Sequence, residues 1–200
     1  YNDRFIKTNV EFDLDTARKR LSYLSRGLLA HCHRTSQLCR ELAQCWHENE
    51  DRAAWAGLVH DLARDYPEGE LLFLARQYGL PIDPMEEITP VLLHGPVGAE
   101  ILKRRWDVTD EGVLEAVRWH TSGNKEMELL AKIVFLADKL EPGKADLYPH
   151  LEHVRKLVTE DLDRALLEFF NSQISYFELK HFRVHPAMLE ARDSLQLKLA

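Results

Sequence analysis

Two nearly apolar helical stretches of this chain each carry or meet an acidic residue at a position that should be buried. The first is residues 53–63, in which His60 and Asp61 stand among alanine, leucine, valine and tryptophan. The second is residues 129–137, apolar apart from one lysine, which lead directly into Asp138. Burying a charge is costly unless it is paired, and imidazole and carboxylate groups are good ligands for divalent metals. These segments predict buried helices whose acids share one cation.

The rest of the chain also has a helical pattern. No run shows the sustained alternation of apolar and polar residues that a half-buried strand requires. Residues 80–90 contain Pro81, Pro84 and Pro90 and are predicted to form a loop. We expect an all-α fold in a single domain, residues 1–200, with helices at about 13–26, 28–47, 51–63, 68–78, 91–105, 110–119, 125–140, 151–158, 161–177 and 186–199.

Composition and charge exclude several classes of protein. A chain of 200 residues with 45% hydrophobic residues can bury a full core and is typical of a globular domain. No stretch reaches the roughly 18 apolar residues that span a bilayer, and the sequence begins without a charged-then-apolar leader. We therefore expect a cytoplasmic protein with no membrane partner. A net charge of −7 argues against a nucleic-acid partner, but a metal and a few basic groups could still hold a small phosphorylated ligand.

His31 is the histidine of the second predicted helix that we expect to face inward. It lies at the edge of an apolar face that carries Leu28, Cys32, Thr35, Cys39, Leu42 and Trp46. His33 is aligned with polar residues instead, because residues two apart on a helix do not share a face, and it is expected to lie in water. Alone, His31 would be explained most simply as an ordinary half-buried histidine.

Two further histidines stand where the chain turns. His94 begins a His-Gly-Pro segment, and Gly95 and Pro96 permit a tight backbone that could aim it into a cleft. His120 ends a predicted helix, where a histidine also interacts favourably with the helix dipole. Each is explained most simply as structural when taken singly. The candidate metal ligands are His31, His60, Asp61 and Asp138. Helix packing could bring both histidines to these ligands, where they could bind phosphate, transfer protons or hold a second metal.

In this order, His31, the His60–Asp61 pair and Asp138 resemble the signature of the HD-domain metal-dependent phosphohydrolases. The flanking sequence is similar to the YqeK branch of that family in residues 56–65, 93–99, 119–127, 132–143 and 184–192. The resemblance covers about residues 25–195 and implies an HD-domain helical bundle.

The YqeK branch hydrolyses diadenosine tetraphosphate symmetrically to two ADP, so the resemblance implies this reaction, by attack of a metal-bound hydroxide on an inner phosphorus. It implies a divalent metal held by His31, His60, Asp61 and Asp138. Iron is the expected metal, with manganese, cobalt, nickel or magnesium as alternatives. Asp61, His94 and His120 would serve catalysis. The partner would be a dinucleoside polyphosphate or ADP, contacted by His31, His94, His120, Thr121, Asp138, Lys144, His181, Phe182, Arg183, Val184, His185 and Pro186.

Several alternatives stay open at this point. The metal site would equally suit an HD-domain nucleotidase or phosphodiesterase that acts on another nucleotide, or a nucleotide-binding sensor with little turnover. An all-α scaffold with incidental histidines would have to explain two buried aspartates. Lys144 stands where the family usually has arginine, and lysine lacks the bidentate fork that suits phosphate. Phe182 could stack on adenine or belong to the core, Asp65 is expected to terminate its helix, and a homodimer is compatible with the sequence.

Overall fold

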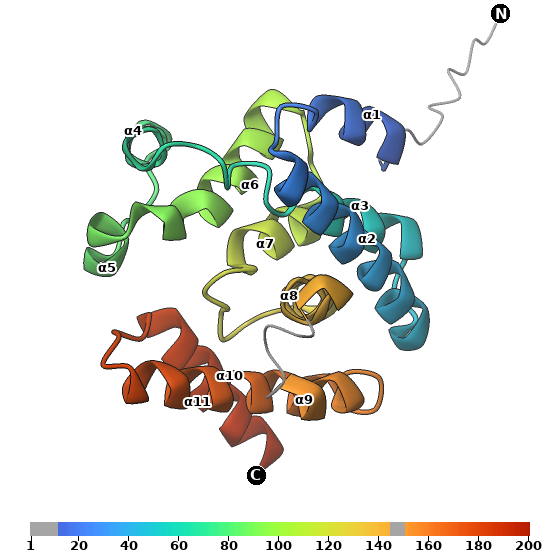
Figure 1. Ribbon diagram of the computed structural model, residues 1–200, viewed down its shortest axis with the longest axis vertical. Coiled ribbons are helices and arrows are strands. Elements are labelled where there is room, and N and C mark those ends of the chain that lie inside the picture. The colour runs from blue at the N-terminus through green and yellow to red at the C-terminus, as the bar shows by residue number, and fades with distance from the viewer. Residues whose placement is uncertain (1–11, 145–150) are drawn as a thin grey trace, which may run out of the picture.

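The computed structural model describes residues 12–144 and 151–200. Within these ranges the regular secondary structure is helical, with no strand (Figure 1). The prediction of an all-α fold is therefore confirmed. Within these residues, no helix is both long and apolar enough to cross a bilayer. The α-helices are α1 (Leu14–Arg20), α2 (Arg26–Trp46), α3 (Glu50–Val59), α4 (Glu68–Tyr78), α5 (Pro84–Ile88), α6 (His94–Arg105), α7 (Glu111–Trp119), α8 (Leu129–Leu140), α9 (Glu152–Leu157), α10 (Leu162–Leu179) and α11 (Pro186–Leu199), with 3₁₀ turns η1 (Pro90–Leu93) and η2 (Pro142–Lys144).

Helix α8 is the centre of the core. Nearly all its side chains are buried, and it packs against α2, α3 and α7 on one side and α10 on the other. Figure 1 shows α9, α10 and α11 as a lower layer beneath it. Phe135 of α8 meets the rings of Phe169 and Phe170 of α10 at centroid distances of 5.3 and 5.2 Å. Aromatic pairs of this kind contribute about 0.5–1.5 kcal/mol each beyond the area they bury, so they fasten the lower layer to α8.

Helices α2 and α3 approach each other closely at a glycine. A Cβ atom on Gly57 would lie 2.6 Å from the Sγ atom of Cys39 and 3.1 Å from the Cα atom of Ser36. The hydroxyl of Ser36 also donates a hydrogen bond of 2.6 Å to the carbonyl of Ala54. This tight crossing brings His31 of α2 to the C-terminal end of α3.

The loop predicted for residues 80–90 is wrong in part, because it contains the short helix α5. Asp83 caps this helix, accepting a hydrogen bond of 2.7 Å from the amide of Met85. Glu86 completes a capping box by accepting one of 2.8 Å from the amide of Asp83. Pro84 stands at the first position of the helix, where its missing N–H costs nothing. Proline here begins a helix and does not break one.

Several predicted boundaries also need correction. Helix α1 ends at Arg20, not at 26, and α8 begins at Leu129, not at 125. Helix α3 ends at Val59, so the His60–Asp61 pair lies in the turn that follows and not inside the helix. Asp65 lies at the end of that turn and accepts a hydrogen bond of 2.8 Å from the amide of Ser25, the N-cap residue of α2. It stabilises the start of a neighbouring helix.

Helices α6 and α7 also approach closely, at Gly95. A Cβ atom there would lie 2.8 Å from the carbonyl oxygen of Arg118 and 3.1 Å from that of Val117. Both obstacles are backbone atoms, which cannot rotate away. This approach places His94, at the start of α6, beside the end of α7.

We expect Gly95→Ala to destabilise the protein by about 1–3 kcal/mol, the usual cost of overpacking, and to lower activity by moving α6 away from α7. Gly98→Ala in the same helix is a matched control, because its Cβ would make only ordinary contacts, the nearest at 3.5 Å. Alanine is favoured over glycine inside a helix by roughly 0.5–1 kcal/mol. Chemical denaturation of both variants tests this, and equal stabilities would contradict the close approach.

Candidate functional site

The predicted ligands come together in one buried cluster at the centre of the fold. His31 comes from α2, the His60–Asp61 pair from the turn after α3, and Asp138 from α8. His94 is the first residue of α6, and His120 follows the last residue of α7. Five of these six side chains are almost inaccessible to solvent: His60, Asp61, His94, His120 and Asp138. Side chains far apart in sequence thus share one small volume.

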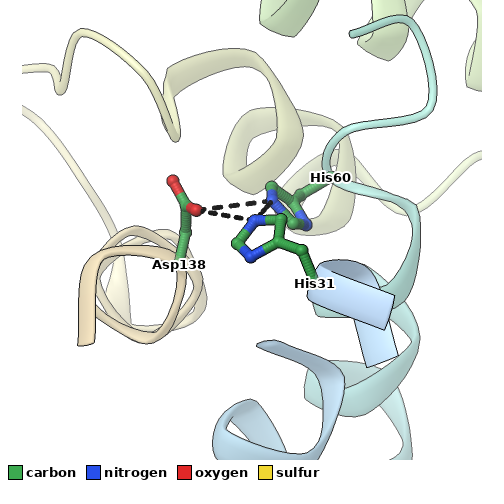
Figure 2. Close-up of side chains that lie close together, drawn as sticks. All are labelled: His31, His60 and Asp138. Carbon is green, nitrogen blue, oxygen red and sulfur yellow. Dashed lines mark hydrogen bonds and ion pairs between the residues drawn. The ribbon is translucent and has the colours of Figure 1, made fainter. Parts of the chain in front are cut away.

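One set of possible metal ligands is His31, His60 and Asp138 (Figure 2). The Nε2 atom of His31 lies 3.0 Å from Oδ1 of Asp138 and 3.2 Å from Nε2 of His60. The Nε2 atom of His60 lies 3.6 Å from the same Oδ1. Two imidazoles and a carboxylate thus direct one ligand atom each to a common point.

A second set, His60, Asp61 and His120, shares His60 with the first. Oδ1 of Asp61 lies 3.2 Å from Nε2 of His120 and 3.1 Å from Nε2 of His94, and its Oδ2 lies 3.4 Å from Nε2 of His60. The same Oδ2 lies 3.7 Å from Nε2 of His31, so Asp61 also faces both histidines of the first set. The Nε2 atoms of His94 and His120 are 2.9 Å apart.

The imidazole tautomers suit metal binding. Nδ1 of His60 lies 2.7 Å from the carbonyl oxygen of Gly57, and Nδ1 of His120 lies 2.7 Å from that of Val117. These carbonyls belong to the last turns of α3 and α7, where no helical partner is present. His94 uses the carbonyl of Val91 in the same way. A carbonyl only accepts, so Nδ1 carries the proton and the lone pair of Nε2 faces the cluster.

Burial and neighbouring charges shift the pKa values of several groups in the cluster. Burial opposes ionisation of Asp61, but the charge of His60, together with the hydrogen bonds from the neighbouring imidazoles, has the larger effect and holds the pKa of the Asp61 carboxyl well below its usual range. Burial likewise opposes ionisation of Asp138, whose pKa is held well below normal by Lys139 and Lys144. Burial disfavours protonation of His60, yet the two carboxylates raise its pKa to about 10. Burial lowers the pKa of His120 to about 4. In the cation-free protein at neutral pH, His60 is therefore protonated on both ring nitrogens, whereas His120 is neutral.

Two lysines connect the cluster with a neighbouring cleft. The ammonium of Lys139 lies 2.6 Å from Oδ2 of Asp138, and that of Lys144 lies 2.7 Å from Oδ1. The hydroxyl of Thr121 lies 3.1 Å from Nε2 of both His94 and His120. The cleft has a volume of about 350 Å³ and is lined by Thr121, Lys139, Lys144, Leu151, Phe169, Gln173, Tyr176, Phe177 and Met188. It is cationic towards the cluster and largely aromatic and apolar elsewhere.

The predicted tail segment is divided between two roles. His181, Phe182 and Arg183 line a separate hollow of about 500 Å³ that shares Phe177 with the cleft. Phe182 is 59% exposed, so it does not belong to the core. Beyond it, Val184 is half-buried, and His185 caps α11 by accepting the amide of Ala187 at 3.2 Å, with Pro186 as the first helical residue.

Sequence reasoning placed one histidine wrongly and missed two site residues. His33 is half-buried and not fully in water, although no contact joins it to the cluster. Glu141 is 1% exposed and touches His31, and Arg34 in turn touches Glu141. Each follows a predicted ligand by three residues, Asp138 in one case and His31 in the other, and that spacing shares a helix face.

Comparisons with known proteins show the family of the chain. The family model described as HD domain matches residues 28–143. A Bacillus subtilis (strain 168) protein named bis(5'-nucleosyl)-tetraphosphatase, symmetrical, is 34% identical over 73% of this chain and 77% of its own length. A protein of the same name from Halalkalibacterium halodurans is 32% identical over 79% of this chain and 83% of its own.

A solved structure gives the same result for the fold. It is described as a predicted HD superfamily hydrolase involved in NAD metabolism from Clostridium acetobutylicum. It superposes with a TM-score of 0.88 at 30% identity and covers 93% of this chain and 98% of its own. The resemblance stated from the sequence is confirmed, and the chain belongs to the HD-domain family.

Proposed function

We propose that this protein hydrolyses diadenosine tetraphosphate symmetrically to two molecules of ADP with the help of a bound divalent cation. One observation carries the proposal: the buried cluster of imidazoles and carboxylates adjoins a cleft with two lysines on one side and aromatic side chains on the other. The names of the Bacillus and Halalkalibacterium relatives supply the substrate.

His31, His60, Asp61 and Asp138 would hold the cation. Imidazole with carboxylate suits iron, which we propose as the resident metal, and also manganese, cobalt and nickel, with magnesium favoured less because it prefers oxygen ligands. When bound, such a cation polarises a phosphate oxygen and lowers the pKa of a water molecule. The second set of ligands, His60, Asp61 and His120, could hold a second cation.

The remaining side chains of the site would bind the phosphates and move protons. Lys144 and Lys139 extend from Asp138 to the cleft, so their ammonium groups are placed to neutralise phosphate charge. His120 is neutral because burial lowers its pKa to about 4, so it is suited to bind a cation or accept a proton. His94 would donate a proton to the departing ADP in its imidazolium form, with Nε2 protonated as well as Nδ1, and Thr121 is bonded to it.

The tail would bind a nucleoside beside the cleft. The hollow formed by His181, Phe182 and Arg183 shares Phe177 with the cleft, so a substrate with two nucleosides could extend from one into the other. The exposed ring of Phe182 is available for stacking, and Arg183 adds positive charge. His185 has a helix-capping role in the structure, which favours a supporting function for Val184, His185 and Pro186 at the base of this hollow.

Product analysis tests the proposed reaction. Protein loaded with iron under anaerobic conditions is incubated with diadenosine tetraphosphate, and the products are separated by chromatography. We expect two ADP per substrate, and no product from Asp138→Ala. AMP with ATP would contradict symmetrical cleavage. Tight binding without turnover would favour the sensor, and hydrolysis of another nucleotide alone would favour a different HD-domain phosphohydrolase.

A further inference from the structure

His31 differs from the other imidazoles of the cluster in how its outer nitrogen is satisfied. His60, His94 and His120 lie at helix ends, and each places Nδ1 against a backbone carbonyl three residues earlier. His31 lies in the second turn of α2, where the carbonyls already accept hydrogen bonds from amides four residues later. Its Nδ1 therefore needs a side-chain partner.

Glu141 is that partner. Its Oε1 lies 3.2 Å from Nδ1 of His31, while Nε2 of His31 faces Asp138 on the opposite edge of the ring at 3.0 Å. Glu141 follows α8, the helix that carries Asp138. One short segment thus contacts both nitrogens of the same imidazole.

Glu141 is itself held rigidly. It is 1% exposed, and Arg34 donates to it through Nε at 2.5 Å and through Nη2 at 3.2 Å. The amide of Gly143 donates to its Oε2 at 2.6 Å. A buried carboxylate with this many donors has little freedom to turn, so it fixes the ring that it contacts.

Gly143 is required for this arrangement. A Cβ atom there would lie 2.6 Å from both Nε and Nη2 of Arg34 and 2.8 Å from its Cζ. A side chain at this position would therefore push the guanidinium away from Glu141. The network runs from Gly143 and Arg34 through Glu141 to His31.

We propose that Glu141, held by Arg34 and Gly143, is a positioning residue that fixes the tautomer and ring orientation of His31, so that its Nε2 lone pair is available to a metal. The inference rests on the proposed function only in needing a metal at this cluster. A carboxylate on the outer nitrogen of an imidazole ligand also raises its basicity, and loss of such partners typically lowers metal affinity by about 10–100-fold.

The main test is Glu141→Leu, measured by calorimetric titration of the metal-free protein with Mn²⁺. We expect a fall in affinity of about 10–100-fold. Long-range ¹H–¹⁵N spectra of the metal-free protein give a second readout. They should show the proton of His31 on Nδ1 in the wild type and a shift towards Nε2 in the variant. A purely structural role for Glu141 would not change the tautomer.

Glu100→Leu is the matched control. Glu100 is also a buried acid, 8% exposed, with two arginine partners, Arg104 at 2.7 Å and Arg118 at 3.3 Å, but no contact joins it to the metal cluster. This variant should lose stability yet keep wild-type affinity for Mn²⁺ and the wild-type tautomer of His31.

Arg34→Met and Gly143→Ala test the network even if Glu141→Leu fails to fold. Both should lower Mn²⁺ affinity less than Glu141→Leu, and their double variant should show less than the sum of the two effects, because both act on one contact. If Glu141→Leu leaves the affinity for Mn²⁺ unchanged, the inference is overturned but the proposed function is not. If Glu141→Leu does not fold, unchanged affinity in Arg34→Met has the same meaning. A wild-type protein that binds no Mn²⁺ overturns the proposed function as well.

Discussion

Replacement of Asp61 by alanine is expected to abolish hydrolysis of diadenosine tetraphosphate and retention of bound metal, with the helical fold largely intact. Asp61 contacts His94 and His120 through Oδ1 and faces His60 through Oδ2. Its Oδ2 also lies 3.7 Å from Nε2 of His31, so Asp61 faces every histidine of both sets of ligands. Loss of a residue that only orients a ligand already costs about 10–100-fold, so loss of a ligand itself should reduce the rate by at least about 100-fold.

The fold should survive because the change removes the cost of burying a carboxylate close to Asp138. Three measurements check this: steady-state rates, metal content after dialysis, and circular dichroism. His33→Ala is the control. His33 lies on the same helix as His31, is half-buried and makes no contact with the cluster, so its variant should keep the wild-type rate. An Asp61→Ala protein that retained full activity would show that the metal site is wrongly assigned.

The sequence allowed prediction of the ligands because each is locally anomalous. A carboxylate that follows a run such as 129–137 has to be either paired or misplaced, and this can be recognised without a structure. His31 was selected over His33 by helical spacing, and the structure brings His31 alone of the two into the cluster. The His-Gly-Pro segment predicts a tight backbone at His94, but it does not predict the close approach that Gly95 makes to α7.

Contacts between distant segments could not be predicted in this way. Arg34 and Glu141 pair across 107 positions of sequence, and only the packing of α2 against α8 brings them together. The sequence pattern does not predict helix α5, because Pro81, Pro84 and Pro90 indicate a loop, whereas the capping box formed by Asp83 and Glu86 decides the local structure. The separation of the tail into a hollow and a helix cap likewise depends on where α11 begins.

The affinity of the site for a cation is expected to rise by about tenfold per pH unit from near neutrality towards pH 10, with release of about one proton, because metal ligands must be deprotonated. Burial disfavours the charged form of His60, but Asp61 and Asp138 raise its pKa from 6.5 to about 10. A cation that uses Nε2 of His60 therefore has to displace a proton at any pH below this value.

The same proton sets the stability of the metal-free protein. A pKa raised on folding contributes stability that is complete below the unfolded value near 6.5 and is lost as the pH rises through the folded value of about 10. The free energy of unfolding of the cation-free protein should thus fall over this range, while that of the cation-loaded protein, whose His60 is already neutral, should not.

Calorimetric titration with Mn²⁺ at pH 7 to 8.5, in two buffers of different ionisation enthalpy, measures the released proton directly. A flat affinity with no proton release would mean that a cation does not bind at His60, and the site would then have to be assigned to His94 and His120 without it.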